Sequence, residues 1–245
     1  MSEIIKTEAV VLRKLNYGDT SSIVSLYTLD FGKISAIIKG GRNPKSKMGM
    51  IADPPNHLEI ILYKKVTREV QFLSASEIIS HFPHLKENLN SLKFAYAVVE
   101  LVQKLSPEDE PNKRIFNGII RILSLFNSSD EKPEIIFSRF TLFFIEESGY
   151  GINLDKCSVC GTTELDKKIL GYNLERGLLC EKCKREYIDN FKIEMELFNY
   201  LNCLKFNKQI KIINENTIKN AIDFFELYLK YHISDFKGIQ SLKSY

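Results

Sequence analysis

The chain has 245 residues, 44% of them hydrophobic, and a formal net charge of +3 at pH 7. This length allows two or three units with buried cores, and so mild a charge does not by itself indicate a polyanionic partner. No stretch reaches the roughly 18 uncharged apolar residues of a membrane helix, and the start, MSEIIKTEAVVLRK, has charges within its apolar stretch, unlike a signal peptide. We therefore expect a soluble, cytoplasmic protein.

The first 80 residues are expected to form a run of short strands. Alternating or β-branched segments at 5–15, 22–28, 33–39, 57–66 and 69–75 are separated by turn residues. Five short strands without intervening helices favour a small all-β barrel. An OB-fold has this size, and the pattern leaves an SH3-like barrel open.

A basic loop interrupts the strands. It reads KGGRNPKSKMGMIADPPN at 39–56, where glycines and prolines predict irregular structure. From residue 33 to 47 the chain has five basic side chains and no acidic one: Lys33, Lys39, Arg42, Lys45 and Lys47. Such a loop beside aromatic-bearing strands can hold nucleic acid through its phosphates and bases. The alternative is an ordinary solvated loop.

After about residue 80 the apolar period changes from two to about 3.6, which predicts helices. The helical patterns cover 92–105, 115–126, 133–149, 195–204 and 218–232. The segment 133–149 is apolar on nearly every side, so we expect it at the centre of a helical bundle. The fold class is therefore α+β and multidomain.

Two Cys-x-x-Cys pairs, Cys157 with Cys160 and Cys180 with Cys183, have the spacing of a zinc site. Ordinary reduced cysteines or two disulfides are the alternatives. Lysines flank the pairs and would offset the charge of four thiolates around one Zn²⁺. Four sulfurs leave no open position on the metal, so we expect structural rather than catalytic zinc. A short hairpin, 169–174 with 177–179, is expected between the pairs.

No motif of an enzyme is recognisable in the chain. It lacks a nucleophile elbow, a His-Glu-x-x-His pair and a nucleotide-binding Gly-x-x-x-x-Gly-Lys-Ser/Thr loop. A zinc-dependent hydrolase would conflict with a metal saturated by four sulfurs. The remaining hypotheses are a DNA-binding protein without catalysis and a zinc-stabilised scaffold that binds only other proteins.

The ordered set of motifs resembles the bacterial RecO family of recombination mediators. The resemblance lies in TEAVVLRKLNYGDTSSIVSLYTLDFGKISAIIKGGRNPKSK at 7–47, NHLEIILYKK at 56–65, the paired cysteines and the closing YLKYHISDFKGIQSLKSY. It implies an OB-fold DNA-binding domain at 1–80, a helical domain at 81–153 and 188–245, and a zinc-binding segment at 154–187.

The resemblance also implies activities and partners. It implies binding of single- and double-stranded DNA, strand annealing, and loading of RecA onto strands coated by single-stranded-DNA-binding protein (SSB), together with RecR and the acidic C-terminal tail of SSB. The implied location is the nucleoid in the cytoplasm. We expect DNA contacts from Lys39, Arg42, Lys45 and Lys47, then from Lys33, Arg13 and Lys64. Arg121 and Arg139 are expected at the rim of a tail-binding pocket.

Overall fold

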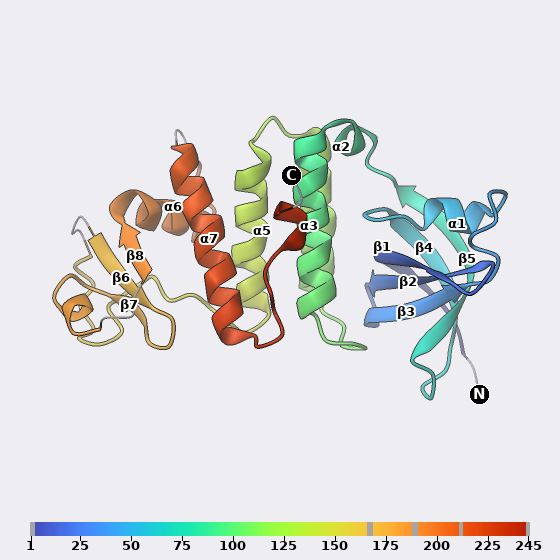
Figure 1. Cartoon of the computed structure of the whole chain (residues 1–245), viewed down its shortest axis with the longest axis horizontal. Helices are drawn as coiled ribbons and strands as arrows, with labels where there is room; N and C mark the ends of the chain where they lie inside the picture. Colours follow the sequence, from blue (N-terminus) through green and yellow to red (C-terminus); the bar gives the residue numbers. More distant parts are fainter. Residues whose placement is uncertain (1–2, 166–168, 188–190, 211–212, 244–245) are drawn as a thin grey trace. The chain divides into compact units, whose positions relative to one another are not determined.

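The computed structural model of the chain describes residues 3–165, 169–187, 191–210 and 213–243 (Figure 1). The chain divides into two compact units. Unit 1 contains the residues up to Pro133 and the segment from Ile239 onward, and unit 2 contains Glu134–Gly238. Across these described ranges, no helix combines the length and the apolar character needed to span a membrane.

Five strands of unit 1 form a closed barrel: β1 (Glu3–Tyr17), β2 (Ser21–Thr28), β3 (Gly32–Ile38), β4 (His57–Lys64) and β5 (Val70–Ser80). Their order is β1-β2-β3-β5-β4, with β1 also pairing with β4. Only the β3–β5 contact is parallel. This Greek-key order is that of the OB-fold. It confirms the expected barrel and decides against the SH3-like barrel that the sequence left open.

The barrel core follows from the alternation of apolar residues along each strand. Inward-facing side chains such as Val24, Leu26, Ile60 and Leu62 are fully buried in one cluster. β1 is long enough to pair with both β2 and β4, and its register shifts between Val11 and Arg13. Such a bulge bends a strand, which helps β1 to close the barrel.

The helices of unit 1 are α1 (Lys47–Ile51), α2 (Pro83–Glu87), α3 (Leu89–Leu105) and α4 (Lys113–Ser128). α3 packs against β1, β2 and α4. Asn88 and Asn112 accept hydrogen bonds from the first backbone N–H groups of α3 and α4, as N-cap residues do. Between these helices, the backbone of Glu110 passes so close to Gly32 that a Cβ there would lie 2.2 Å from the Glu110 oxygen.

Unit 2 combines helices with a small sheet. Its elements are α5 (Pro133–Glu147), β6 (Ile169–Asn173), β7 (Gly177–Leu179), the 3-10 turn η1 (Cys183–Arg185), β8 (Phe191–Glu194), α6 (Met195–Lys205) and α7 (Glu215–His232). The β6–β7 hairpin was expected, whereas β8, which pairs with β6, was not. Tyr172 of β6 packs edge-on against Phe224 and Tyr228 of α7, with ring centroids 5.0 and 6.0 Å apart.

Candidate nucleic-acid interface and metal centre

The basic loop begins with consecutive turns and contains α1. Backbone bonds run from Gly41 N to Ile38 O and from Arg42 N to Thr20 O. Ser46 then caps α1 by accepting from Gly49 N at 3.1 Å. A Cβ on Gly49 would lie 2.0 Å from the Gly41 oxygen, so α1 lies directly against the first turn of the loop. The loop is therefore more ordered than its glycines and prolines predict.

Five of the expected DNA contacts are exposed: Lys39, Arg42, Lys45, Lys47 and Arg13. Four lie in the loop, and the fifth lies on β1. Arg42 links the loop to the β1–β2 turn, because its Nη1 donates to Gly18 O at 2.6 Å. Lys39 Nζ lies 5.6 Å from the ring centroid of Phe72 on β5, within the range of a cation–π contact.

Lys33 and Lys64 have partners inside the protein. Lys33 is buried, and its Nζ donates to Gln103 O at 3.0 Å and lies 3.3 Å from Glu108. Lys64 pairs with Asp109 at 3.0 Å, and its Nζ lies 4.4 Å from the Phe31 ring centroid. These two lysines thus join the barrel to the acidic segment between α3 and α4.

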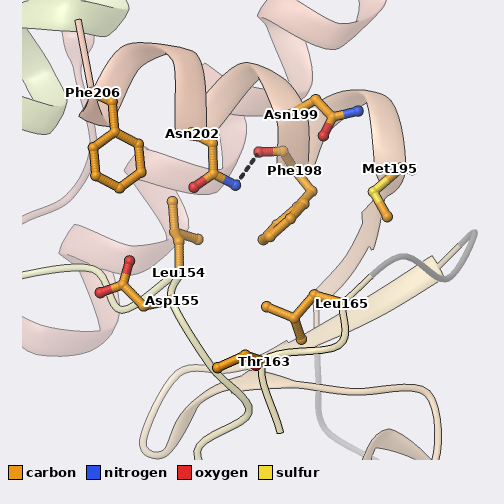
Figure 2. A pocket seen from close by; sticks show the side chains of 9 residues that line it. All are labelled: Leu154, Asp155, Thr163, Leu165, Met195, Phe198, Asn199, Asn202 and Phe206. Atoms are coloured by element: carbon orange, nitrogen blue, oxygen red, sulfur yellow. Dashed lines mark hydrogen bonds between the residues drawn. The ribbon is translucent and has the colours of Figure 1, made fainter.

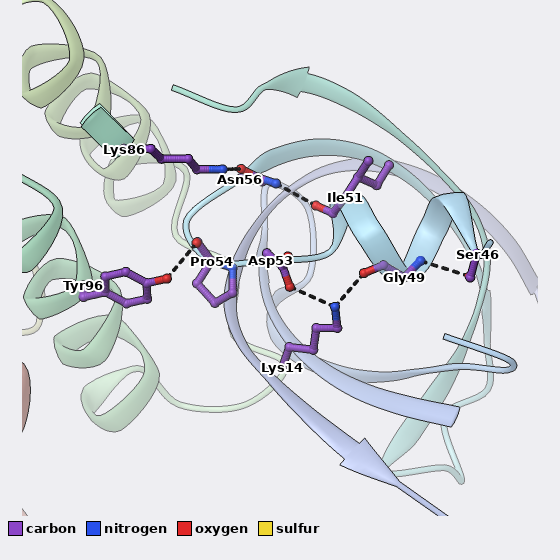
Figure 3. A network of polar contacts seen from close by, with 9 residues as sticks. All are labelled: Lys14, Ser46, Gly49, Ile51, Asp53, Pro54, Asn56, Lys86 and Tyr96. Atoms are coloured by element: carbon purple, nitrogen blue, oxygen red, sulfur yellow. Dashed lines mark hydrogen bonds and ion pairs between the residues drawn. The ribbon is translucent and has the colours of Figure 1, made fainter. Parts of the chain in front are cut away.

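Sequence reasoning missed the residues that fasten the loop (Figure 3). Lys14 of β1 donates to Gly49 O at 2.6 Å and pairs with Asp53 at 2.8 Å. Asn56 is buried, donates to Ile51 O at 2.8 Å and accepts from Lys86 of α2 at 2.6 Å. The loop is therefore tied both to the barrel and to the helices of unit 1. Nothing in the sequence distinguishes Lys14 from the neighbouring exposed Arg13 except its place in the strand alternation.

The four predicted ligands lie together in unit 2. All four Sγ atoms are within 4.8 Å of one another, and those of Cys160 and Cys180 are 3.7 Å apart. Sulfurs bound tetrahedrally to one Zn²⁺ would be about 3.8 Å apart, given Zn–S bonds of about 2.3 Å. Cys157, Cys180 and Cys183 are buried, whereas Cys160 is exposed. The cluster could therefore hold one metal ion.

Local backbone structure holds the cysteines in place. Gly161 N donates to Cys157 O at 2.9 Å, Lys184 N donates to Cys180 O at 2.9 Å, and Ser158 N donates to Leu178 O of β7 at 2.8 Å. Each Cys-x-x-Cys pair thus sits in its own turn, and the Ser158 bond ties the first turn to the sheet.

The pKa values of the clustered cysteines favour the binding of a cation. Burial raises the pKa of Cys157, but backbone N–H groups of Cys160, Cys180 and Val159 outweigh this effect and lower the pKa to about 6. Burial and the neighbouring thiols raise the pKa of Cys183 to about 12. One sulfur is thus favoured as a thiolate while the proximity of the others opposes further ionisation. A bound divalent cation would remove that opposition.

Unit 2 also has an open pocket of about 670 Å³ between α6 and the segments on either side of the first Cys-x-x-Cys pair (Figure 2). Apolar side chains line much of it, including Leu154, Leu165, Phe198 and Phe206. Lys208 Nζ lies 5.5 Å from the Phe206 ring centroid, and Lys205 pairs with Asp155 at 3.3 Å. The pocket therefore has a largely apolar lining with cationic side chains next to it.

Of the two arginines expected at a pocket rim, Arg139 lies on α5 in unit 2. Its Nη1 donates to Asn207 Oδ1 at 3.4 Å, next in sequence to Phe206 of the pocket. Arg121 is exposed on α4, which belongs to unit 1.

Comparisons with known proteins give matches along most of the chain. A family model described as "Recombination protein O N terminal" matches residues 1–82, and one described as "Recombination protein O C terminal" matches residues 86–238. A protein of Alkaliphilus metalliredigens named DNA repair protein RecO is 34% identical over 81% of this chain and 80% of its own length.

Other relatives carry the same name. The protein of Chloroherpeton thalassium is 28% identical over 97% of this chain and 96% of its own length. That of Chlorobium limicola is 37% identical, over 64% of this chain and 60% of its own length. The first matched region ends just after β5, and the second begins within α2.

Proposed function

This chain belongs to the RecO family of DNA repair proteins, and from that premise we propose that it is a non-enzymatic recombination mediator. It binds and anneals DNA, and together with RecR it assists the loading of RecA onto single strands coated by SSB. The similarity of the chain to proteins named DNA repair protein RecO supports a role in DNA repair. The contacts of the barrel support binding of DNA by the basic loop.

The observation that carries the proposal is the exposed basic loop fastened to the barrel. Arg42, Lys45 and Lys47 are exposed, and α1, within the loop, is anchored by Lys14 and Asn56. Cations held on an ordered backbone lose less freedom when they pair with phosphates than cations on a flexible loop would. Because Lys33 and Lys64 are engaged inside unit 1, the proposed contacts are Lys39, Arg42, Lys45, Lys47 and Arg13.

A salt titration tests this proposal. Affinity for a single-stranded oligonucleotide should fall with salt, with a log–log slope of about −0.7 for each phosphate neutralised. The variant Arg42→Ala/Lys45→Ala/Lys47→Ala should have a slope about two units shallower. The matched control replaces three exposed lysines of unit 2, Lys192, Lys219 and Lys230, by alanine.

Two results would count against the proposal. If the loop variant binds and anneals DNA like the parent, the loop is not the DNA site. If the parent shows no salt-dependent affinity at all, the protein is better described as a scaffold that binds only other proteins.

The cysteine cluster is proposed to hold one structural Zn²⁺. Four sulfur ligands suit zinc and leave no position for water or substrate. Its contribution is then to hold the turns at Cys157–Cys160 and Cys180–Cys183 against the β6–β7 hairpin. Elemental analysis of the purified chain should find one zinc per chain, and another metal or none would contradict the assignment.

The pocket in unit 2 is the proposed docking site for the acidic C-terminal tail of SSB. Its apolar lining suits the hydrophobic part of a peptide, and Lys208 and Arg139 beside it suit carboxylates. Phe206→Ala should weaken binding of a tail peptide, whereas Leu227→Ala, an exposed apolar residue on α7, should not. Equal affinity of the Phe206→Ala variant and the parent would rule out this pocket.

A further inference from the structure

The pocket of unit 2 lies between two walls that are held in different ways (Figure 2). One wall, here called the helix wall, is formed by α6 and the residue after it: Met195, Phe198, Asn199, Asn202 and Phe206. The other, here called the loop wall, lies on both sides of the first Cys-x-x-Cys pair: Leu154, Asp155, Thr163 and Leu165. A ligand that fills the pocket contacts both walls.

The helix wall is held by regular structure. Leu197, Tyr200, Leu201 and Leu204 of α6 are buried, and α6 packs against α7. β8, directly before α6, pairs with β6. These contacts do not involve the cysteines of the cluster. We therefore expect the helix wall to keep its shape whether or not a metal ion is bound.

The loop wall has little packing of its own. Residues 150–165, all of which the structure describes, form neither helix nor strand. From Asp155 to Glu164, Cys157 is the only buried residue. Lys205 of α6 pairs with Asp155 at 3.3 Å, but the Asp155 side chain is 62% exposed, and such a pair contributes little stability. A segment with so few buried contacts opens easily.

The cysteine cluster is what fastens the loop wall to the sheet. Cys157 N donates to Thr162 O at 2.9 Å, which closes the turn that contains the first pair. Cys180 and Cys183 follow β7 in the chain, so an ion bound by all four sulfurs ties this turn to the β6–β7 hairpin. A bound ion therefore fixes the chain between Asp155 and Thr163, and both of these residues line the pocket.

We propose that metal occupancy of the cysteine cluster controls the pocket. With the ion bound, the loop wall is ordered and the pocket binds its acidic peptide; without the ion, the loop wall is loose and the peptide binds weakly. The proposal rests on the zinc and the peptide docking proposed above, and adds that the two sites are coupled. Such coupling is reciprocal, so the peptide raises the affinity for Zn²⁺ by the same factor as Zn²⁺ raises the affinity for the peptide.

The expected factor is about 5-fold to 150-fold, the usual range for coupling between two sites. Without the ion, the peptide must itself order the loop wall, and the lost conformational freedom weakens its binding. Binding is not abolished, because the helix wall stays in place with the cations beside it, Lys208 and Arg139.

The test compares the zinc-loaded full chain with the same chain stripped by a chelator, both under reducing conditions. The probe is a fluorescent peptide with the sequence of the SSB C-terminal tail. The stripped chain should bind it about 5-fold to 150-fold more weakly, and added Zn²⁺ should restore the affinity. Affinity for a single-stranded oligonucleotide, measured on the same samples, should not change, because the basic loop lies in unit 1.

The reciprocal measurement determines the affinity for Zn²⁺ by competition with a chromophoric chelator. A saturating concentration of the peptide should raise this affinity by the same factor. Phe206→Ala removes an apolar side chain of the helix wall and leaves every cysteine in place. At the same peptide concentration this variant should show a smaller effect of the peptide on the affinity for Zn²⁺. Leu227→Ala, on α7, is the matched control.

The outcomes separate the coupling from the functions on which it rests. Equal peptide affinity of the loaded and stripped chains overturns the coupling, and the docking site stands if Phe206→Ala still weakens binding. Peptide binding by neither form refutes the docking site itself. A stripped chain that loses affinity for the peptide and the oligonucleotide together has unfolded as a whole, which also overturns control of the pocket.

A second measurement needs neither peptide nor variant. Removal of the ion should speed hydrogen exchange at the amides of Cys157 and Gly161, whose bonds to Thr162 O and Cys157 O close the first turn. The amides of Leu201 and Leu204 in α6 should exchange as before. Unchanged exchange at Cys157 and Gly161, or an equal increase in α6, would contradict a loop wall that depends on the metal while the helix wall does not.

Discussion

Glu100 of α3 binds Ser241, with its carboxylate accepting from the Ser241 backbone N–H at 2.7 Å and from the hydroxyl at 2.6 Å. The same carboxylate accepts from Gln240 N at 2.8 Å, and Lys104 pairs with it at 2.5 Å. It therefore satisfies the first N–H groups of the 3-10 turn η2 (Gln240–Leu242). This contact holds the segment after Gly238 on unit 1.

Replacing Glu100 should release this segment. Burial raises the pKa of Glu100, but the bonds from Lys104, Ser241 and Gln240 outweigh it and hold the pKa below its usual value. The contribution of these bonds to the free energy of unfolding is thus present at neutral pH and is lost as the pH falls below about 4.5. Glu100→Gln should speed hydrogen exchange at Gln240 and Ser241 about tenfold to a hundredfold. Glu87→Gln, which removes only an exposed pair with His84, is the control, and equal protection in both variants would contradict the assignment.

The barrel should lose stability in mild acid through His57. Burial lowers the pKa of His57, and the nearby Glu8 carboxylate, 2.8 Å away, only partly offsets this. Because the unfolded histidine takes up a proton more readily, the unfolding free energy should fall below about pH 6.5, by at most about 1.4 kcal/mol per pH unit.

Hydrogen exchange of barrel amides between pH 7.5 and 5.5, corrected for intrinsic rates, measures this slope. In Glu8→Gln the charge that opposes the effect of burial is gone, so the slope should become steeper. A shallower slope in that variant would show that His57 is not the group responsible.

Loss of one cysteine ligand should loosen unit 2 without disturbing the barrel. Cys180→Ser should lose most of the proposed zinc, and with it a large part of a stabilisation that is about 10–16 kcal/mol in zinc-finger peptides. Amides of Leu178 and Leu179 should then exchange faster. Cys203→Ser, outside the cluster, should keep its metal. If folded Cys180→Ser protein bound DNA far more weakly, the cluster would take a direct part in that binding.

Gly49→Ala should displace α1. Its new Cβ would meet the Gly41 backbone oxygen at 2.0 Å, and backbone cannot move aside as a flexible side chain can. We expect a loss of about 1–3 kcal/mol in stability, together with weaker DNA binding, because the loop cations move with α1. Gly151→Ala, where nothing lies within 4 Å, is the matched control. Normal stability of Gly49→Ala would show that α1 is not packed against the loop as described.

Local patterns in the sequence predicted those features that depend on neighbouring residues. Strand alternation placed β2 almost completely, as 22–28 against the observed Ser21–Thr28. The spacing of the four cysteines likewise predicted their cluster. The signal for β2 lies within the strand itself, and the signal for the cluster lies in two short motifs, Cys157–Cys160 and Cys180–Cys183, in one segment of the chain.

Features made by distant segments were not predictable in this way. The engagement of Lys33 depends on Gln103 and Glu108, some 70 residues away. α1 was missed because Gly49 argues against a helix, although Gly49 is needed there for its contact with Gly41. A row of outward-facing apolar side chains on the barrel was also missed, because it appears only when five strands are placed in register: Leu15, Ile23, Ile37, Phe72 and Tyr63.

The division of the chain into units has a consequence for its synthesis. Unit 1 takes residues from both sides of unit 2 in the sequence, so the ribosome completes Glu134–Gly238 before it makes the partners of Glu100. Until then the nascent chain leaves this half-buried carboxylate of α3 without Gln240 and Ser241. Unit 2 can thus mature before unit 1 is finished, an order opposite to that of domains strung end to end.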